Sequence, residues 1–96
     1  MTKPRLTQQE HIELGRVLAG IQDEILRRRV RLLNAYPRTG PEAVPAAKLK
    51  AAIQALREAR DELENAVFRE HPATASTGDY FPGEEDRAVI VSPRRS

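Results

Sequence analysis

The chain has 96 residues, of which 40% are hydrophobic, with two tyrosines, two phenylalanines and no tryptophan or cysteine. The absence of cysteine excludes a disulfide framework and thiolate chemistry. No apolar run is long enough to span a membrane, and the N-terminus lacks the apolar run of a signal peptide, so we expect a cytoplasmic protein. The net charge of +2 does not by itself indicate a nucleic-acid partner. Arginine outnumbers lysine thirteen to three, which favours a bacterial origin.

The first predicted element is a long helix that follows a flexible arm, residues 1–6. Thr7 and Glu10 have the spacing of a capping box, in which each side chain bonds the other's backbone N–H. Apolar residues then recur at helical spacing until Pro37, which cannot continue a helix. We therefore predict a helix over residues 7–36. Each glycine in this helix lowers its helix propensity by about 1 kcal/mol. Close helix–helix contact or a mild bend would explain why glycines are present.

A second long helix follows a loop predicted over residues 37–44. Residues 36–45 contain three prolines and a glycine, and proline is favoured in the first turn of a helix. The second helix is predicted over residues 45–71, with Pro72 as its stop. Its leucines are seven residues apart, with alanines between them, as in a coiled coil. This spacing predicts a packing seam that allows a close neighbour.

The predicted fold is all-α, an antiparallel two-helix hairpin, because the connection is short. In the predicted register, residues whose numbers add up to about 81 or 82 are neighbours. The hairpin seam is assigned to Leu18, Ile21, Ile25, Leu49, Leu56 and Leu63. A second apolar face is assigned to Val17, Leu26, Val30, Leu33 and Ile53. One neighbouring helix cannot cover so broad a face, so we expect a homodimer that forms a four-helix bundle.

The last predicted segment, residues 72–96, is a mostly extended or disordered tail. It holds large side chains that have no helical seam to join, and these either fold back on the hairpin or form a motif for another protein within residues 79–91. The β-prone run near its end could add as a strand to a partner's sheet. The candidate motif residues are Tyr80, Phe81, Val89, Ile90 and Val91.

Charge is distributed unevenly along the predicted hairpin. Seven cations and one acid lie between residues 27 and 50, whereas acids outnumber arginines between residues 57 and 70. A basic pole of this kind could bind nucleic acid through phosphate contacts, although no aromatic residues interleave for base stacking. We favour the interpretation that the basic pole is a solvated face, whose charge complements the acidic pole of a second hairpin packed antiparallel. The basic pole comprises Arg27, Arg28, Arg29, Arg31, Lys48 and Lys50.

Two further features of the sequence bear on chemistry. The predicted register brings together the helix ends that carry the two histidines, and imidazole and carboxylate groups there are metal ligands. Their spacing within each helix is not a chelating one, so we expect no metal and no cofactor. The weak candidates are His11, His71, Glu10 and Glu70. Arg28 interrupts the apolar stripe of the first helix and is a candidate for a buried charge whose stem lies along that stripe.

The layout loosely resembles the small helical hairpins exported by type VII secretion. Those proteins carry a Tyr-x-x-x-Asp/Glu signal after their second helix, which Tyr80 and Glu84 match. They also carry a Trp-x-Gly loop, for which residues 36–40 have no counterpart. The resemblance implies a small secreted hairpin as a further alternative.

No specific catalytic or nucleotide-binding motif is present, so we expect no enzyme activity. The predicted function is protein–protein interaction, as a scaffold, adaptor or regulatory subunit that acts through the apolar face and the tail. The alternative is a nucleic-acid-associated protein that uses the basic pole.

Overall fold

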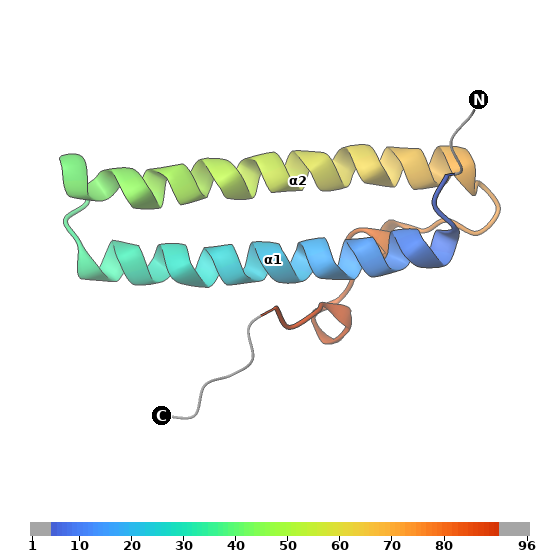
Figure 1. Ribbon diagram of the computed structural model, residues 1–96, viewed down its shortest axis with the longest axis horizontal. Coiled ribbons are helices and arrows are strands. Elements are labelled where there is room, and N and C mark those ends of the chain that lie inside the picture. Colours follow the sequence, from blue (N-terminus) through green and yellow to red (C-terminus); the bar gives the residue numbers. More distant parts are fainter. Residues whose placement is uncertain (1–4, 91–96) are drawn as a thin grey trace.

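The computed structural model describes residues 5–90, and in these it is all-helical, as predicted. Two long helices, α1 (Gln8–Ala35) and α2 (Val44–Glu70), run antiparallel side by side (Figure 1). Three single-turn 3-10 helices complete the described part, namely η1 (Pro41–Ala43), η2 (Thr77–Asp79) and η3 (Glu84–Asp86). Neither α1 nor α2 contains a stretch apolar enough to cross a membrane.

Local sequence signals set the ends of α1. The predicted capping box is present, because the Glu10 N–H donates to Thr7 Oγ1 at 3.1 Å and the Thr7 N–H donates to Glu10 Oε1 at 2.8 Å. At the other end Tyr36 is extended, with φ −130° and ψ 156°. Residues that precede a proline favour this conformation, because the proline ring clashes with a helical neighbour. α2 begins beside Pro45, as proline's fixed φ allows.

Side-chain contacts between α1 and α2 agree with the predicted register. His11 Nε2 lies 3.0 Å from Glu70 Oε1 near the open end of the hairpin. About three turns further along, the Arg60 guanidinium donates to Gln22 Oε1 at 2.6 Å. Hydrophobic periodicity and loop length therefore suffice to align the two helices.

The buried line of α2 differs from the predicted alternation of leucine and alanine. Ala46, Arg60 and Val67 are buried and share one side of the helix, whereas Ala52 and Ala59 are exposed. The seam leucines, Leu49, Leu56 and Leu63, are half-buried. The helix therefore packs on α1 through its leucines and through Ala46, Arg60 and Val67, each three or four residues from one of them. Of the intervening alanines only Ala66 is half-buried.

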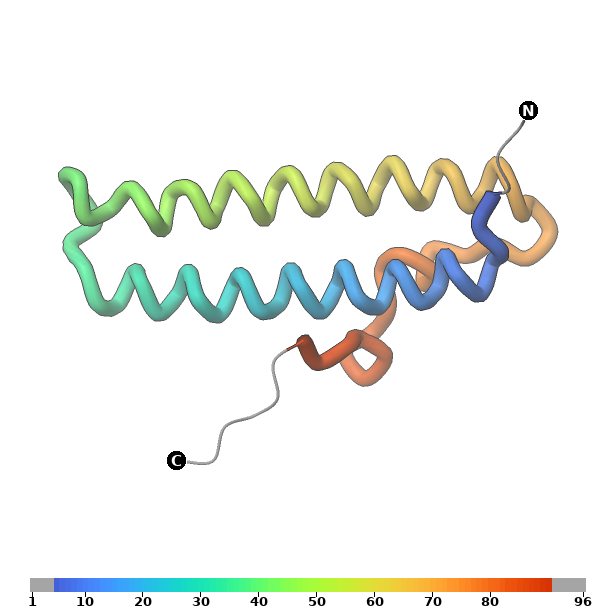
Figure 2. The backbone as a smooth tube through the Cα atoms, viewed as in Figure 1, coloured from blue at the N-terminus to red at the C-terminus, as the bar shows by residue number. Residues whose placement is uncertain are grey.

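The tail, residues 72–90, folds back on the hairpin. It returns from the end of α2 along the two helices and then crosses α1, so that residues 83–90 lie on the far side of α1 from α2, as the backbone trace shows (Figure 2). Tyr80 is fully buried, and the Ala88 N–H donates to the Arg16 carbonyl at 3.1 Å. The part of the tail that the structure describes is therefore packed, where the sequence suggested a mostly extended or disordered segment.

Two glycines of α1 allow the tail to cross at close range. A Cβ built on Gly15 would lie 1.8 Å from the Asp79 carbonyl oxygen, and one on Gly20 would lie 2.1 Å from the Ala88 carbonyl oxygen. Neither separation is sterically allowed. The glycines were expected to serve close helix–helix contact or a bend, but they serve the approach of the tail backbone.

Candidate functional site

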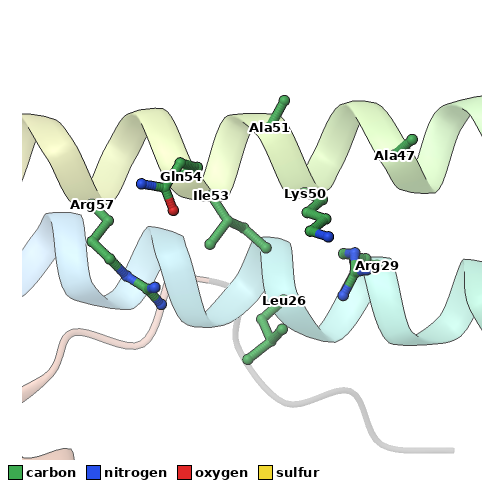
Figure 3. A pocket seen from close by; sticks show the side chains of 8 residues that line it. All are labelled: Leu26, Arg29, Ala47, Lys50, Ala51, Ile53, Gln54 and Arg57. Carbon is green, nitrogen blue, oxygen red and sulfur yellow. The ribbon is translucent and has the colours of Figure 1, made fainter.

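The groove between α1 and α2 is the candidate functional site, and it has two halves. In the tail-filled half, near the open end of the hairpin, Tyr80 and Phe81 lie between the helices. In the open half, towards the loop, a pocket of about 470 Å³ remains (Figure 3). The residues that line the open half are Leu26, Arg29, Ala47, Lys50, Ala51, Ile53, Gln54 and Arg57.

The two halves are continuous along both helices. Ala19 is fully buried, whereas Leu26 is 46% exposed, although seven residues place both on the same side of α1. On α2, Arg60 is buried beside the tail, and Ile53, seven residues before it, is half-buried in the pocket. As far as residue 90, the tail therefore covers only part of a surface that continues along both helices with the same geometry.

The open half combines an apolar floor with a basic rim. Leu26 and Ile53 are its large apolar side chains, while Arg29, Lys50 and Arg57 supply three cations and the lining contains no acid. The Arg29 Nε is buried and has no hydrogen-bond partner among the described residues. A buried donor of this kind is normally satisfied, so this nitrogen is an exception among the described residues.

Arg60 fixes the tail in its half of the groove. Its Nε and Nη2 donate to the Tyr80 carbonyl oxygen at 3.0 and 2.8 Å, and its guanidinium carbon lies 4.4 Å from the centre of the Phe81 ring. Burial lowers the pKa of Arg60 from its ordinary value, and Arg87 adds to this effect. Hydrogen bonds and a cation–π contact compensate for the loss of water around the charge.

Arg87 forms an ion pair between the tail and α1. Its Nη1 lies 2.6 Å from Asp23 Oδ1, and its Nε donates to the Pro82 carbonyl oxygen. Both side chains are partly exposed, so the pair contributes less than Arg60 does.

His11 connects the tail to the end of α2 through a buried hydrogen-bond chain. Its Nδ1 bonds the Tyr80 hydroxyl and its Nε2 bonds Glu70. The buried phenol has no other partner in the described part of the chain, so we assign the Tyr80 O–H as donor to Nδ1. His11 Nε2–H then donates to the Glu70 carboxylate. This bond, with the positive groups nearby, lowers the pKa of Glu70.

Burial raises the pKa of Tyr80 from 10.0 to about 12, and the negative charges of Glu70 and Asp79 add to this effect. Because the folded pKa lies above the unfolded one, the stability that the neutral phenol contributes is complete below pH 10 and is lost as the pH rises from 10 to about 12. We expect phenolate absorbance to appear together with release of the tail. Ultraviolet titration in a Tyr36→Phe background isolates Tyr80, and a titration midpoint near the ordinary value of 10.0 would contradict the burial.

The same cluster contains the metal candidates. Ligand atoms of His11, Glu70 and His71 lie within 4.8 Å of one another. Glu10 is not in this trio, because its carboxylate caps α1. A cation on His11 Nε2 would move the ring proton to Nδ1, so the Tyr80 O–H would lose its acceptor. His71 Nε2 also bonds the Leu6 carbonyl oxygen at 3.1 Å. The arrangement thus suits a structural network better than a metal centre.

The residues assigned to the second apolar face do not share one side of the hairpin. Leu26 and Val30 are 46% and 47% exposed, on the side of α1 that carries the groove. Val17 is also exposed, but nine residues separate it from Leu26, which places it on the opposite side of α1. Ile53 lies in the open half and Leu33 is half-buried. Val17 therefore cannot belong to the same contact face as Leu26 and Val30. The seam residues Leu18, Ile21 and Ile25 are half-buried.

The basic pole and the tail motif are each divided by the structure. Arg29 and Lys50 line the open half, whereas Arg27 and Arg28 are exposed and pair with Glu24 on the same helix. Arg28 is thus not a buried charge. Arg31 and Lys48 are exposed. In the tail motif Tyr80 is buried and Phe81 half-buried, Val89 and Ile90 are exposed, and Val91 lies outside the described residues.

The residues that sequence reasoning missed are the ones that hold the tail. The buried arginine is Arg60, and its partner Gln22 and the buried Asp79 were not singled out. One sequence signal could have identified Arg60 as a buried residue. It belongs to an otherwise apolar series of residues spaced seven apart, namely Ala46, Ile53, Arg60 and Val67.

Comparison with known protein families, with curated proteins and with solved structures finds no match to this chain.

Proposed function

We propose that this chain is a non-enzymatic protein–protein interaction module, a scaffold, adaptor or regulatory subunit, whose binding surface is the open half of the interhelical groove. One observation carries this proposal. The described part of the tail, residues 72–90, fills half of a continuous groove and does not cover the other half, which holds Leu26 and Ile53. An apolar groove between two helices typically accepts the apolar face of a third helix.

The chemistry of the open half defines the partner. Its apolar floor requires apolar anchors, and Arg29, Lys50 and Arg57 require acids beside them. The partner is therefore an acidic amphipathic helical segment. Nucleic acid is less well suited, because the lining offers no aromatic side chain for base stacking and its floor is aliphatic. The type VII alternative is also less well suited, because the Tyr80 side chain is buried against His11 and not presented to a receptor.

Leu26→Asp is expected to weaken binding of an acidic helix at least tenfold, because a carboxylate on the apolar floor loses a contact and repels the partner's acids. The probe is a labelled synthetic amphipathic peptide of leucine, alanine and glutamate, and the measurement is fluorescence anisotropy. A tenfold change corresponds to about 1.4 kcal/mol.

Val17→Asp is the matched control, since Val17 is 41% exposed on the opposite side of α1. If Val17→Asp weakens peptide binding as much as Leu26→Asp does, the binding surface lies elsewhere on the hairpin. Salt-sensitive retention of DNA by the unaltered chain, without peptide binding, would replace the proposal by the nucleic-acid alternative.

A further inference from the structure

The side of α2 that borders the groove carries a regular stripe of side chains. Its members are spaced alternately four and three residues apart, which keeps them on one side of a helix. Five of them are polar or charged, and the last is aromatic. In chain order they are Lys50, Gln54, Arg57, Asp61, Glu64 and Phe68.

The first half of this stripe lines the open half of the groove and the second half does not. Lys50, Gln54, Arg57 and Asp61 are exposed, Glu64 is half-buried and Phe68 is 40% exposed. The described residues form no ion pair with Lys50, Arg57, Asp61 or Glu64. The stripe is therefore a largely accessible surface whose charges form no ion pair with other residues in 5–90.

The stripe is complementary to itself when it is reversed. Arg57 and Asp61 are equally far from residue 59, and so are Gln54 and Glu64, and Lys50 and Phe68. Two copies of α2 laid antiparallel about residue 59 therefore set each Arg57 against the other copy's Asp61. Phe68 of the second copy then lies over Lys50, beside Ile53 and Leu26. A twofold contact requires this kind of self-complementarity.

We infer that the acidic segment bound in the open half is α2 of a second copy of this chain, packed antiparallel so that residues 61–68 of each copy lie against the open half of the other. This inference rests on the proposed function and names its partner. The chain's own last residues are a poor alternative, because Arg94 and Arg95 are basic and residues 91–96 contain no acid. The resulting assembly is the four-helix bundle that the surplus apolar surface predicts.

A charge exchange between two variants tests the pairing. The first variant carries Lys50→Glu and Arg57→Glu, and the second carries Asp61→Lys and Glu64→Lys. Each variant sets like charges against each other at both symmetric contacts, so its molar mass by light scattering should fall to that of the monomer. In an equimolar mixture each contact again joins opposite charges, so the mass should double, to that of a heterodimer. Circular dichroism verifies that both variants keep their helices.

The outcomes separate this inference from the proposed function. A dimer that survives both double substitutions, or a mixture that stays monomeric, overturns the antiparallel pairing. An unaltered chain that is monomeric yet binds the leucine, alanine and glutamate peptide through Leu26 overturns the inference and keeps the interaction module. A chain that neither self-associates nor binds that peptide overturns both. If the pairing is correct, the unlabelled peptide also competes with dimer formation.

Discussion

Gly15→Ala is expected to release the tail from the hairpin and to lower the free energy of unfolding by about 2 kcal/mol. The new methyl group would lie 1.8 Å from the Asp79 carbonyl oxygen, and since that atom belongs to the backbone, the tail must move away. Movement exposes Tyr80, whose burial contributes roughly 1.5–3 kcal/mol, and breaks its hydrogen bond to His11 at about 1 kcal/mol. The gain in helix propensity, about 1 kcal/mol, offsets only part of this loss.

Two measurements check this expectation. Thermal unfolding followed by circular dichroism reports the loss of stability, and trypsin cleavage after Arg87 reports whether the tail is docked. Gly78→Ala is the matched control, because a Cβ there meets only Ser76 Oγ, at 3.7 Å. If Gly15→Ala left both the unfolding temperature and the cleavage rate at their original values, the close crossing of α1 by the tail would be wrong.

Arg60→Met is expected to lower the free energy of unfolding by about 3 kcal/mol. Methionine keeps the apolar stem but removes both donors to the Tyr80 carbonyl and the donor to Gln22. Each buried acceptor left unsatisfied costs about 1–3 kcal/mol, and the lost contact with Phe81 adds about 1 kcal/mol. A buried charge can be replaced without loss only when its partners are replaced as well, and a backbone carbonyl cannot be.

The control for Arg60→Met is Arg69→Met, an exposed arginine on the same helix. Substitutions at such exposed positions usually change stability by about 0.5 kcal/mol or less. Chemical denaturation of both variants gives the comparison. Equal stabilities of the two would mean that Arg60 does not hold the tail.

Both substitutions also bear on the binding surface. The tail divides the groove into a filled and an open half, so its release would extend the apolar surface from Leu26 back to Ala19. The released variants should then bind the acidic amphipathic peptide with a less defined register. Gly15 and Arg60 therefore determine how much of the groove a partner can reach.

The sequence by itself determined the two helices and their alignment. The helix ends depend on interactions between residues close in the chain, such as the Thr7 and Glu10 capping box and the breaks at Pro37 and Pro45. The alignment depends on hydrophobic periodicity. Both kinds of signal can be identified in the sequence alone. The meeting of His11 with Glu70 follows from helix length and a short loop.

Only the tertiary structure decided the path of the tail and the identity of the buried polar groups. The tail has no periodicity, so nothing local predicts that Tyr80 lies between the helices or that Gly15 is the point of crossing. The burial of Arg60 and the exposure of Arg28 could not be distinguished by residue type, since each arginine lies close to an apolar stripe. The difference arises because the tail supplies a buried carbonyl to Arg60, whereas Arg28 finds its acid, Glu24, one turn away on the surface.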